Sequence, residues 1–168
     1  GVAGGRGGAT GGVPWVGGGR RTVAVGEVLR PVVDAVVVVR SMELELPSLP
    51  EGVKVVVDRE ASRGPLAGIR DGLAATGAAS AFVTSTDAPF LTEAYVTALF
   101  EFAGEKACAP VEDGFVQVLA AIYPRSAHRD AQRLLDEGQG RPRSLLESLS
   151  YLPFEPKLGV AGRQANSP

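Results

Sequence analysis

The amino-acid sequence predicts an α/β fold with three layers, built on a Rossmann-like, mostly parallel sheet with an antiparallel hairpin insertion. Apolar runs typical of buried strands alternate with helical patterns through most of the chain. Residues 32–39 are mostly valine, as in a strand that is covered on both faces. The alternation stops at a turn, residues 112–114, which has a strand pattern on either side. We expect one domain over residues 1–168, with no internal repeat.

The composition indicates a soluble globular protein of the cytoplasm. Of its 168 residues, 45% are hydrophobic and 21% are charged, which is ordinary for a domain with a sizeable core. The net charge of -2 gives no basic field, so we expect neither nucleic acid nor a membrane as a partner. A single cysteine, Cys108, excludes an internal disulfide and a cysteine-based zinc site. No apolar run is long enough to cross a bilayer, and no signal segment opens the chain.

Glycine is concentrated before residue 27, and residues 4–19 combine it with few polar side chains. Such a segment packs poorly, but it can present backbone N–H groups to the phosphates of a close ligand. A flexible linker is the alternative interpretation. A phosphate-binding loop normally follows a strand, and hardly any strand precedes Gly4. We therefore expect that the chain has been trimmed at its N-terminus.

Helix and strand patterns alternate in the first half of the chain. Residues 20–29 predict a helix, which we expect Pro31 to end because proline removes a backbone donor. A second helix, over residues 64–76, has an apolar stripe and ends at Gly77. This stripe consists of Leu66, Ile69, Leu73 and Ala74. The elements expected here are, in order, helix 20–29, strand 32–39, loop 42–50, strand 53–58 and helix 64–76.

The central strand, residues 81–84, is apolar and brings Asp87 to its carboxyl end. Pro89 stops the ladder because it has no backbone N–H, and Thr92 then caps a helix that extends to Gly104. In an open α/β sheet, ligands bind outside the carboxyl ends of the strands. Asp87 is therefore a candidate ligand of a divalent cation, and a turn or capping aspartate is the alternative.

The last third of the chain predicts a hairpin followed by two helices. Cys108 lies in an apolar strand, so we expect it in the core. The only histidine, His128, has Arg129 and Asp130 as neighbours, so we expect it at the surface. The elements expected here are strand 106–111, turn 112–114, strand 115–123, helix 126–135, helix 143–149 and strand 151–154.

Three candidate sites lie at the carboxyl ends of predicted strands or in the loops that follow them. The first is the glycine loop around Gly4 and Gly5, whose backbone donors suit phosphate oxygens. The second is Asp58 with the helix start at 64–65, where a buried carboxylate could accept hydrogen bonds from a base or a hydroxyl. The third is Asp87. Because these loops share one rim of the sheet, they could contact a single nucleotide.

Three segments resemble, in order and spacing, the molybdenum cofactor guanylyltransferases: Val2-Ala3-Gly4-Gly5, Gly64-Pro65-Leu66-Ala67-Gly68-Ile69 and Thr86-Asp87-Ala88-Pro89-Phe90-Leu91. The likeness continues through residues 119–125 and 140–146, so it covers most of the chain. The resemblance implies a nucleotidyltransferase that moves GMP from GTP to molybdopterin and releases pyrophosphate. It also implies a nucleotide-diphospho-sugar transferase-like fold. The Gly-Pro-Leu-Ala-Gly segment is the most specific, and it favours guanylyl over cytidylyl transfer.

The resemblance also implies roles for the matching residues. Residues 2–5 match the loop that contacts guanine and phosphates, Asp58 matches a nucleotide-contacting aspartate, and Asp87 matches the catalytic ligand of Mg²⁺. The implied cofactor is Mg²⁺, and the implied substrates are GTP and molybdopterin. Molybdoenzymes or other cofactor-pathway proteins are the implied recipients of the product. The implied site residues are Val2, Ala3, Gly4, Gly5, Asp58, Gly64, Pro65, Leu66 and Asp87.

The chain departs from the family pattern at three places. Ala9-Thr10-Gly11 stands where the family has Arg-Met-Gly, and Pro14 or Trp15 stands where a lysine is usual. Arg40-Ser41 occupies the region where an asparagine is usual. Loss of a group that stabilises transition-state charge lowers a rate by about 10²–10³. Two alternatives therefore stay open: a non-catalytic nucleotide-binding protein on the same fold, and a related cytidylyl or sugar-phosphate nucleotidyltransferase.

Overall fold

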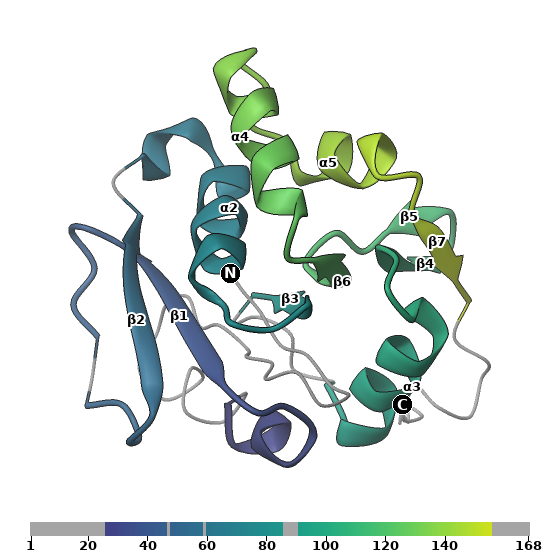
Figure 1. The fold of residues 1–168 in the computed structure, drawn as a ribbon, viewed down its shortest axis with the longest axis horizontal. Coiled ribbons are helices and arrows are strands. Elements are labelled where there is room, and N and C mark those ends of the chain that lie inside the picture. The colour runs from purple at the N-terminus through teal and green to yellow at the C-terminus, as the bar shows by residue number, and fades with distance from the viewer. Residues whose placement is uncertain (1–25, 47, 59, 86–90, 156–168) are drawn as a thin grey trace, which may run out of the picture.

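A computed structural model describes residues 26–46, 48–58, 60–85 and 91–155 (Figure 1). Residues 26–29 are helical and lead directly into a 3-10 turn. The strands are β1 (Val36–Ser41), β2 (Val53–Asp58), β3 (Ser80–Thr84), β4 (Cys108–Glu112), β5 (Phe115–Val116), β6 (Ala120–Pro124) and β7 (Leu152–Phe154). The 3-10 turns are η1 (Arg30–Val32) and η2 (Ala61–Arg63), and the longer helices are α2 (Pro65–Ala75), α3 (Glu93–Ala103), α4 (Ala127–Asp136) and α5 (Pro142–Ser148).

The described strands form two sheets. β1 and β2 pair in parallel, with Ser41 opposite Asp58. In the second sheet β6 lies between β3 and β4 and is antiparallel to both, while β7 is parallel to β4. β3, β4 and β7 therefore share one direction. β6 is the antiparallel insertion that the sequence predicts.

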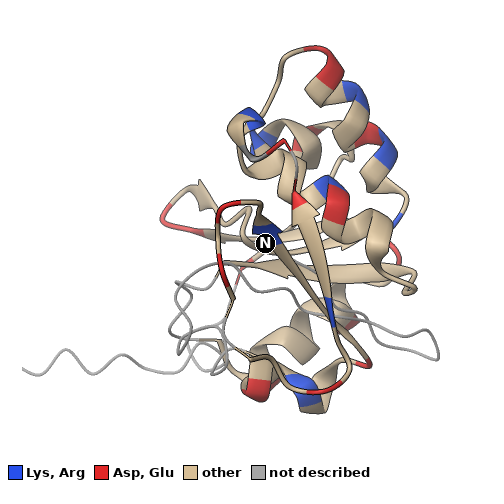
Figure 2. Cartoon of the chain, turned by 90° about the vertical axis from the view of Figure 1, so that its left-hand side faces the viewer, with Lys and Arg blue, Asp and Glu red and all other residues tan. Residues whose placement is uncertain are grey.

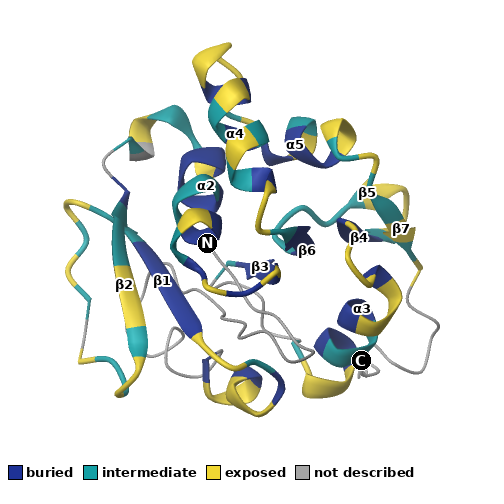
Figure 3. Cartoon of the chain, viewed as in Figure 1, coloured by how far each residue is buried: buried dark blue, intermediate teal, exposed yellow. Residues whose placement is uncertain are grey.

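Side chains of the second sheet alternate between two hydrophobic clusters, one on each face. Ala81 and Val83 belong to the cluster that contains buried residues of α2, α4 and α5. Phe82, between them, belongs to the cluster that contains buried residues of α3. β6 alternates in the same way, and β3 is buried along its whole length (Figure 3). Helices thus cover both faces, which confirms the predicted three-layer α/β arrangement.

The helices confirm most of the predicted burial and capping. The Thr92 side chain accepts a hydrogen bond from the Tyr95 N–H over 3.2 Å, so Thr92 caps α3 as predicted. Leu66, Ile69 and Leu73 of α2 are buried, but Ala74 is exposed. The other neighbour of Leu73, Gly72, is buried, so the buried face of α2 extends on the side of Gly72 and not on the side of Ala74. No helix among the described residues is long and apolar enough to span a membrane.

The predicted helix end at residue 29 is confirmed, but the predicted strand start at residue 32 is wrong. The α-helical segment ends at Leu29, and the 3-10 turn η1, which contains Pro31, follows it. Proline is tolerated in η1 because the N–H groups of a first turn have no intrahelical acceptor. The strand therefore begins at Val36, later than the predicted 32–39, and extends to Ser41.

The predicted return strand 115–123 is also wrong, because the chain turns at residues 117–119 between β5 and β6. The Gln117 N–H donates to the Pro110 carbonyl over 2.8 Å. The Tyr123 hydroxyl donates to the Val118 carbonyl over 2.9 Å. After the turn, β6 still pairs with β4, with Ile122 opposite Cys108, and it also pairs with β3.

Candidate functional site

A cavity of about 330 Å³ opens at the carboxyl ends of β1, β2 and β3. The start of α2 and the residue before β6 complete its wall. We refer to it as the rim cavity. Ligands of open α/β sheets bind at this edge, so the cavity lies where the sequence predicts a site. Its lining residues are Val39, Arg40, Ser41, Leu44, Asp58, Gly64, Pro65, Gly68, Ser85 and Leu119.

Asp58 is the last residue of β2, and it is only 6% exposed. Its Oδ1 accepts a hydrogen bond from the Glu60 N–H over 2.8 Å, which fixes the carboxylate in place. Burial raises the pKa of Asp58 above its ordinary value, and the Glu60 N–H lowers it by less. Such a carboxyl group is costly to ionise without partners, so it suits a ligand that donates hydrogen bonds.

Gly64 and Pro65 begin α2 at the cavity wall. Gly64 has a φ of +90°, which favours glycine, and its carbonyl accepts from the Ala67 N–H over 3.2 Å. The backbone of Gly140 packs directly against this segment. A Cβ added to Gly140 would lie 2.2 Å from the Arg63 carbonyl oxygen. The loop before α5 therefore supports the start of α2.

Ion pairs hold the loop between β2 and α2. The Glu60 carboxylate pairs with Arg63 over 2.8 Å and also with Arg70. These two guanidinium groups lower the pKa of Glu60. Arg70 also bonds to Gln132 over 3.0 Å, and Arg63 donates to the Leu135 carbonyl, so the loop is tied to α4. Basic and acidic residues are interspersed on the side of the molecule that faces the viewer in Figure 2.

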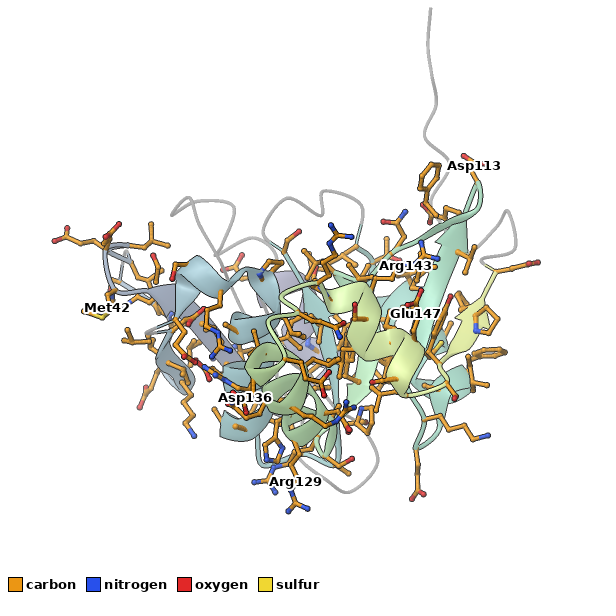
Figure 4. All side chains as sticks on the ribbon, turned by 90° about the horizontal axis from the view of Figure 1, so that it is seen from above. Met42, Asp113, Arg129, Asp136, Arg143 and Glu147 are labelled. Atoms are coloured by element: carbon orange, nitrogen blue, oxygen red, sulfur yellow. The ribbon has the colours of Figure 1, made fainter. Side chains whose placement is uncertain are left out.

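Arg40 organises the loop after β1. Its Nη1 donates to the carbonyls of Ser41 and Met42, each over 3.1 Å, and to that of Leu44 over 2.9 Å. The Met42 side chain is 66% exposed and lies at the outer margin of the molecule (Figure 4). Leu44, by contrast, lines the rim cavity. The Arg40 side chain thus shapes one wall of the cavity as well as lining it.

The structure brings some of the predicted site residues together. Asp58, Gly64 and Pro65 all line the rim cavity. Leu66 does not: its side chain is fully buried in the core, so only its backbone could approach a ligand. Residues 2–5 and Asp87 lie outside the described residues. Ser85, which the chain reaches just before the undescribed segment 86–90, lines the cavity.

Sequence reasoning misses several lining residues. Gly68 lies one turn into α2. The sequence singles it out only as part of the Gly-Pro-Leu-Ala-Gly segment and not as a site residue. Leu44 and Leu119 lie in loops that are held by side-chain hydrogen bonds to backbone carbonyls, from Arg40 to Leu44 and from Tyr123 to Val118. A signal for Arg40 is its position directly after a valine-rich run, where a buried strand meets the rim. No group of three or more metal-binding side chains is present among the described residues.

A family model described as the MobA-like NTP transferase domain matches residues 3–152. Two curated relatives are named "Probable molybdenum cofactor guanylyltransferase". The one from Chloroflexus aggregans is 29% identical over 136 residues, which are 78% of this chain. The one from Pyrococcus furiosus is 32% identical over 110 residues, which are 62% of this chain. The chain spans 64% and 54% of the lengths of these relatives, respectively.

Solved structures with a similar fold come from several organisms. A protein from Aquifex aeolicus has a TM-score of 0.70 at 18% identity, covering 92% of each chain. Molybdopterin-guanine dinucleotide biosynthesis protein A from Archaeoglobus fulgidus has a TM-score of 0.60 at 22% identity, covering 86% of this chain and 83% of that one. The 2-C-methyl-D-erythritol 4-phosphate cytidylyltransferase from Thermus thermophilus has a TM-score of 0.65 at 14% identity, covering 91% and 92%. These likenesses confirm the predicted nucleotide-diphospho-sugar transferase-like fold.

Proposed function

Because the chain belongs to the MobA-like NTP transferase domain family, we propose that it is a nucleotidyltransferase. We propose further that it transfers GMP from GTP to molybdopterin and releases pyrophosphate. The shared name of the two curated relatives supports this choice of substrates. Molybdoenzymes or other proteins of the cofactor pathway would then receive the product.

One observation carries the proposal: a buried carboxylate and a glycine-containing helix start share the rim cavity. The carboxylate of Asp58 has two acceptor oxygens. Guanine presents two adjacent donors, the N1–H and the 2-amino group, so its edge matches these oxygens. Gly68 leaves room beside the carboxylate, since a Cβ there would lie 3.8 Å from Asp58 Oδ2. In this proposal Asp58 contacts the base and the strand ends surround the nucleoside.

The proposed reaction is a displacement at the α-phosphate. A phosphate oxygen of molybdopterin forms a bond to the α-phosphorus of GTP, and the bond from that phosphorus to the bridging oxygen of the β-phosphate breaks. Pyrophosphate leaves with the bridging oxygen. The attacking phosphate is already ionised at neutral pH, so the site needs no general base. Residues 2–5 would bind the phosphates through backbone N–H groups.

Asp87 would hold Mg²⁺ at the phosphates. Mg²⁺ prefers oxygen ligands and is usually bound through one or two carboxylates together with substrate phosphates. Ser85 lines the rim cavity, and Asp87 follows it two residues later in the sequence, which supports this proposal. When bound, the ion would neutralise phosphate charge and polarise the α-phosphate.

The test is isothermal titration of GTP with Mg²⁺ into the native protein and into Asp87→Ala. We expect the native protein to bind GTP and the variant to bind it at least about tenfold more weakly, because a metal ligand is lost. Lys54→Met is a control, since Lys54 is exposed on β2 and does not line the cavity. Equal binding by the native protein and Asp87→Ala would remove Asp87 from the site. Pyrophosphate release on addition of molybdopterin would establish the transfer itself.

Two alternative functions have specific support. The absence of the family's Arg-Met-Gly and lysine at Ala9-Thr10-Gly11 and Pro14-Trp15 favours a non-catalytic nucleotide-binding protein. That alternative predicts GTP binding without pyrophosphate release. The likeness to a cytidylyltransferase from Thermus thermophilus favours a cytidylyl or sugar-phosphate transferase. A panel of nucleotides in a thermal-shift assay separates it from a guanylyltransferase, because CTP would then stabilise the protein more than GTP does.

A further inference from the structure

The rim cavity has one basic and one acidic residue in its wall. Arg40 is its basic residue and Asp58 its acidic residue among the lining side chains described. In the β1–β2 register Ser41 lies opposite Asp58, and Arg40 lies opposite Val57. Successive residues of a strand point to opposite faces, so the Arg40 side chain starts on the face opposite to that of Asp58 and reaches the cavity wall around the end of β1.

These two charges do not form an ion pair in the described part of the structure. Asp58 instead accepts from the Glu60 backbone, and Arg70, Asp71 and Glu60 are the charges that influence its pKa. Arg40 bonds through Nη1 to backbone carbonyls. A ligand in the cavity therefore meets a guanidinium and a carboxylate that have not neutralised each other.

The guanidinium of Arg40 is held in place through one of its nitrogens, Nη1, which leaves N–H groups on the other two for a ligand. It has five N–H groups in one rigid plane, and Nη1 carries only two of them. Three carbonyls around Nη1 fix that plane relative to the loop of residues 41–44. Nε and Nη2 carry the other three N–H groups, and no described residue accepts from them. Such a preorganised group loses little conformational entropy when it binds a ligand.

The cavity wall suits a neutral group with neighbouring donor and acceptor edges better than it suits an anion. A phosphate at this wall would face the Asp58 carboxylate as well as Arg40, and the two effects would oppose each other. Guanine has the required edges: O6 and N7 accept, while N1–H and the 2-amino group donate. Arginine pairs with O6 and N7 of guanine through two parallel hydrogen bonds. Adenine replaces the O6 acceptor with an amino group, which a guanidinium cannot pair with.

We propose that Arg40 is a specificity-determining residue that donates hydrogen bonds to O6 and N7 of guanine. This inference rests on the proposed function. Asp58 accepts from the neighbouring edge of the same base, from the N1–H and the 2-amino group. Arg40 stands in the region where the guanylyltransferases that the sequence resembles usually have asparagine. Asparagine cannot supply two parallel donors to two acceptors on one edge as arginine does. The contact is therefore a property of this chain and not of its family motif.

The test measures the affinities of GTP, 7-deaza-GTP and ITP by titration with Mg²⁺ on native protein and Arg40→Met. 7-deaza-GTP lacks the N7 acceptor, and ITP lacks the 2-amino donor. In the native protein we expect each analogue to bind about tenfold more weakly than GTP, because each loses a base-edge contact. In Arg40→Met the ratio of GTP to 7-deaza-GTP affinity should fall towards one, while the ratio of GTP to ITP affinity stays as in the native protein.

Matched variants separate this effect from general loss of charge or fold. Lys54 is a matched control because its Nζ also donates to a backbone carbonyl, that of Ala75 over 2.8 Å. Lys54 does not line the cavity, so Lys54→Met removes a cation outside the cavity wall. It should leave both ratios unchanged. Arg40→Lys keeps the charge but cannot form two parallel bonds, so it should also lower the GTP to 7-deaza-GTP ratio. If Arg40→Met does not fold, Arg40→Lys carries the same comparison.

If the native protein binds GTP, the proposed function stands. Two results would then still overturn the inference about Arg40. Equal weakening of all three nucleotides in Arg40→Met would mean that Arg40 only shapes the 41–44 loop. Guanosine, titrated as a fourth ligand, identifies a phosphate contact: if Arg40→Met binds GTP more weakly but guanosine as well as the native protein does, Arg40 contacts phosphate. Failure of the native protein to bind GTP would instead contradict the proposed function, and the inference with it.

Discussion

Gly68 keeps the space beside the Asp58 carboxylate open. Gly68→Ala would place a Cβ 3.8 Å from Asp58 Oδ2 and 3.9 Å from Val39 Cγ1, which are ordinary contacts. Because glycine in a helix interior costs about 0.5–1 kcal/mol relative to alanine, we expect the variant to be more stable than the native protein. The added methyl group also occupies the cavity, so we expect weaker GTP binding.

Thermal unfolding and titration with GTP measure these two effects of Gly68→Ala separately. The combination of higher stability and lower affinity distinguishes a filled binding site from a damaged fold. Unchanged affinity would show that the nucleotide does not approach this part of α2.

Asp58 should make the stability of the fold depend on pH. Its pKa is raised in the folded state, chiefly by burial, so the folded protein binds this proton more tightly than the unfolded chain. The resulting stabilisation is complete below the ordinary aspartate pKa and is lost as pH rises through the raised one. Asp58→Asn does not titrate at this position. Its unfolding free energy minus that of the native protein should therefore increase with pH across this window.

Urea denaturation at a series of pH values, from below the ordinary aspartate pKa to neutrality, measures this difference. It should level off above the raised pKa. A difference that is constant or falls with rising pH would show that ionisation of Asp58 is not penalised in the fold.

The residues that line the rim cavity differ in how far the sequence reveals them. Asp58, Gly64 and Pro65 could be predicted as neighbours, because strand ends and the following helix starts share one rim. Arg40 could not, because the predicted strand ended at residue 39 and the wall beyond it depends on hydrogen bonds to three carbonyls. Such bonds are set by the course of a loop, which local pattern does not encode.

At the scale of elements, the contact between the loop before α5 and the start of α2 is the tightest point near the site. In Gly140→Ala the new Cβ would meet the Arg63 carbonyl oxygen at 2.2 Å, so one of two backbones must move. We expect destabilisation by about 1–3 kcal/mol, together with weaker nucleotide binding because the start of α2 shifts. Chemical denaturation and titration with GTP measure the two effects.

Gly138→Ala is a matched control in the same loop. Gly138 has nothing within 4 Å of an added Cβ, and its φ of +78° makes the substitution cost about 1 kcal/mol through backbone strain alone. It should leave GTP affinity unchanged. If both variants lose the same stability and neither loses affinity, the Gly140 contact does not position α2.

Helices were easier to predict than strands for a physical reason. The Thr92 cap of α3 and the buried stripe of α2 at Leu66, Ile69 and Leu73 follow from local side-chain chemistry, and both are confirmed. The break between β5 and β6 depends on the Tyr123 hydroxyl reaching the Val118 carbonyl. That bond exists only after the hairpin has folded, so the apolar pattern of residues 115–123 looks continuous in the sequence.

For the whole molecule, the alternation of strands and helices was sufficient to predict three layers. β3 is an unbroken buried run whose successive residues belong to opposite clusters, as expected of a strand covered on both faces. The order of strands was not predictable, since the position of β6 between β3 and β4 depends on long-range pairing.

The reversed direction of β6 has a consequence for how such a fold can diversify. Because β6 runs opposite to β3, its beginning lies beside the end of β3, and Leu119 and Ser85 line the cavity together. The hairpin that precedes β6, with Asp113 at its tip, projects from the molecule (Figure 4). None of the hairpin residues 112–116 lines the rim cavity, so lengthening or reshaping that appendage would leave the cavity wall and the parallel pairing of β1 and β2 in place.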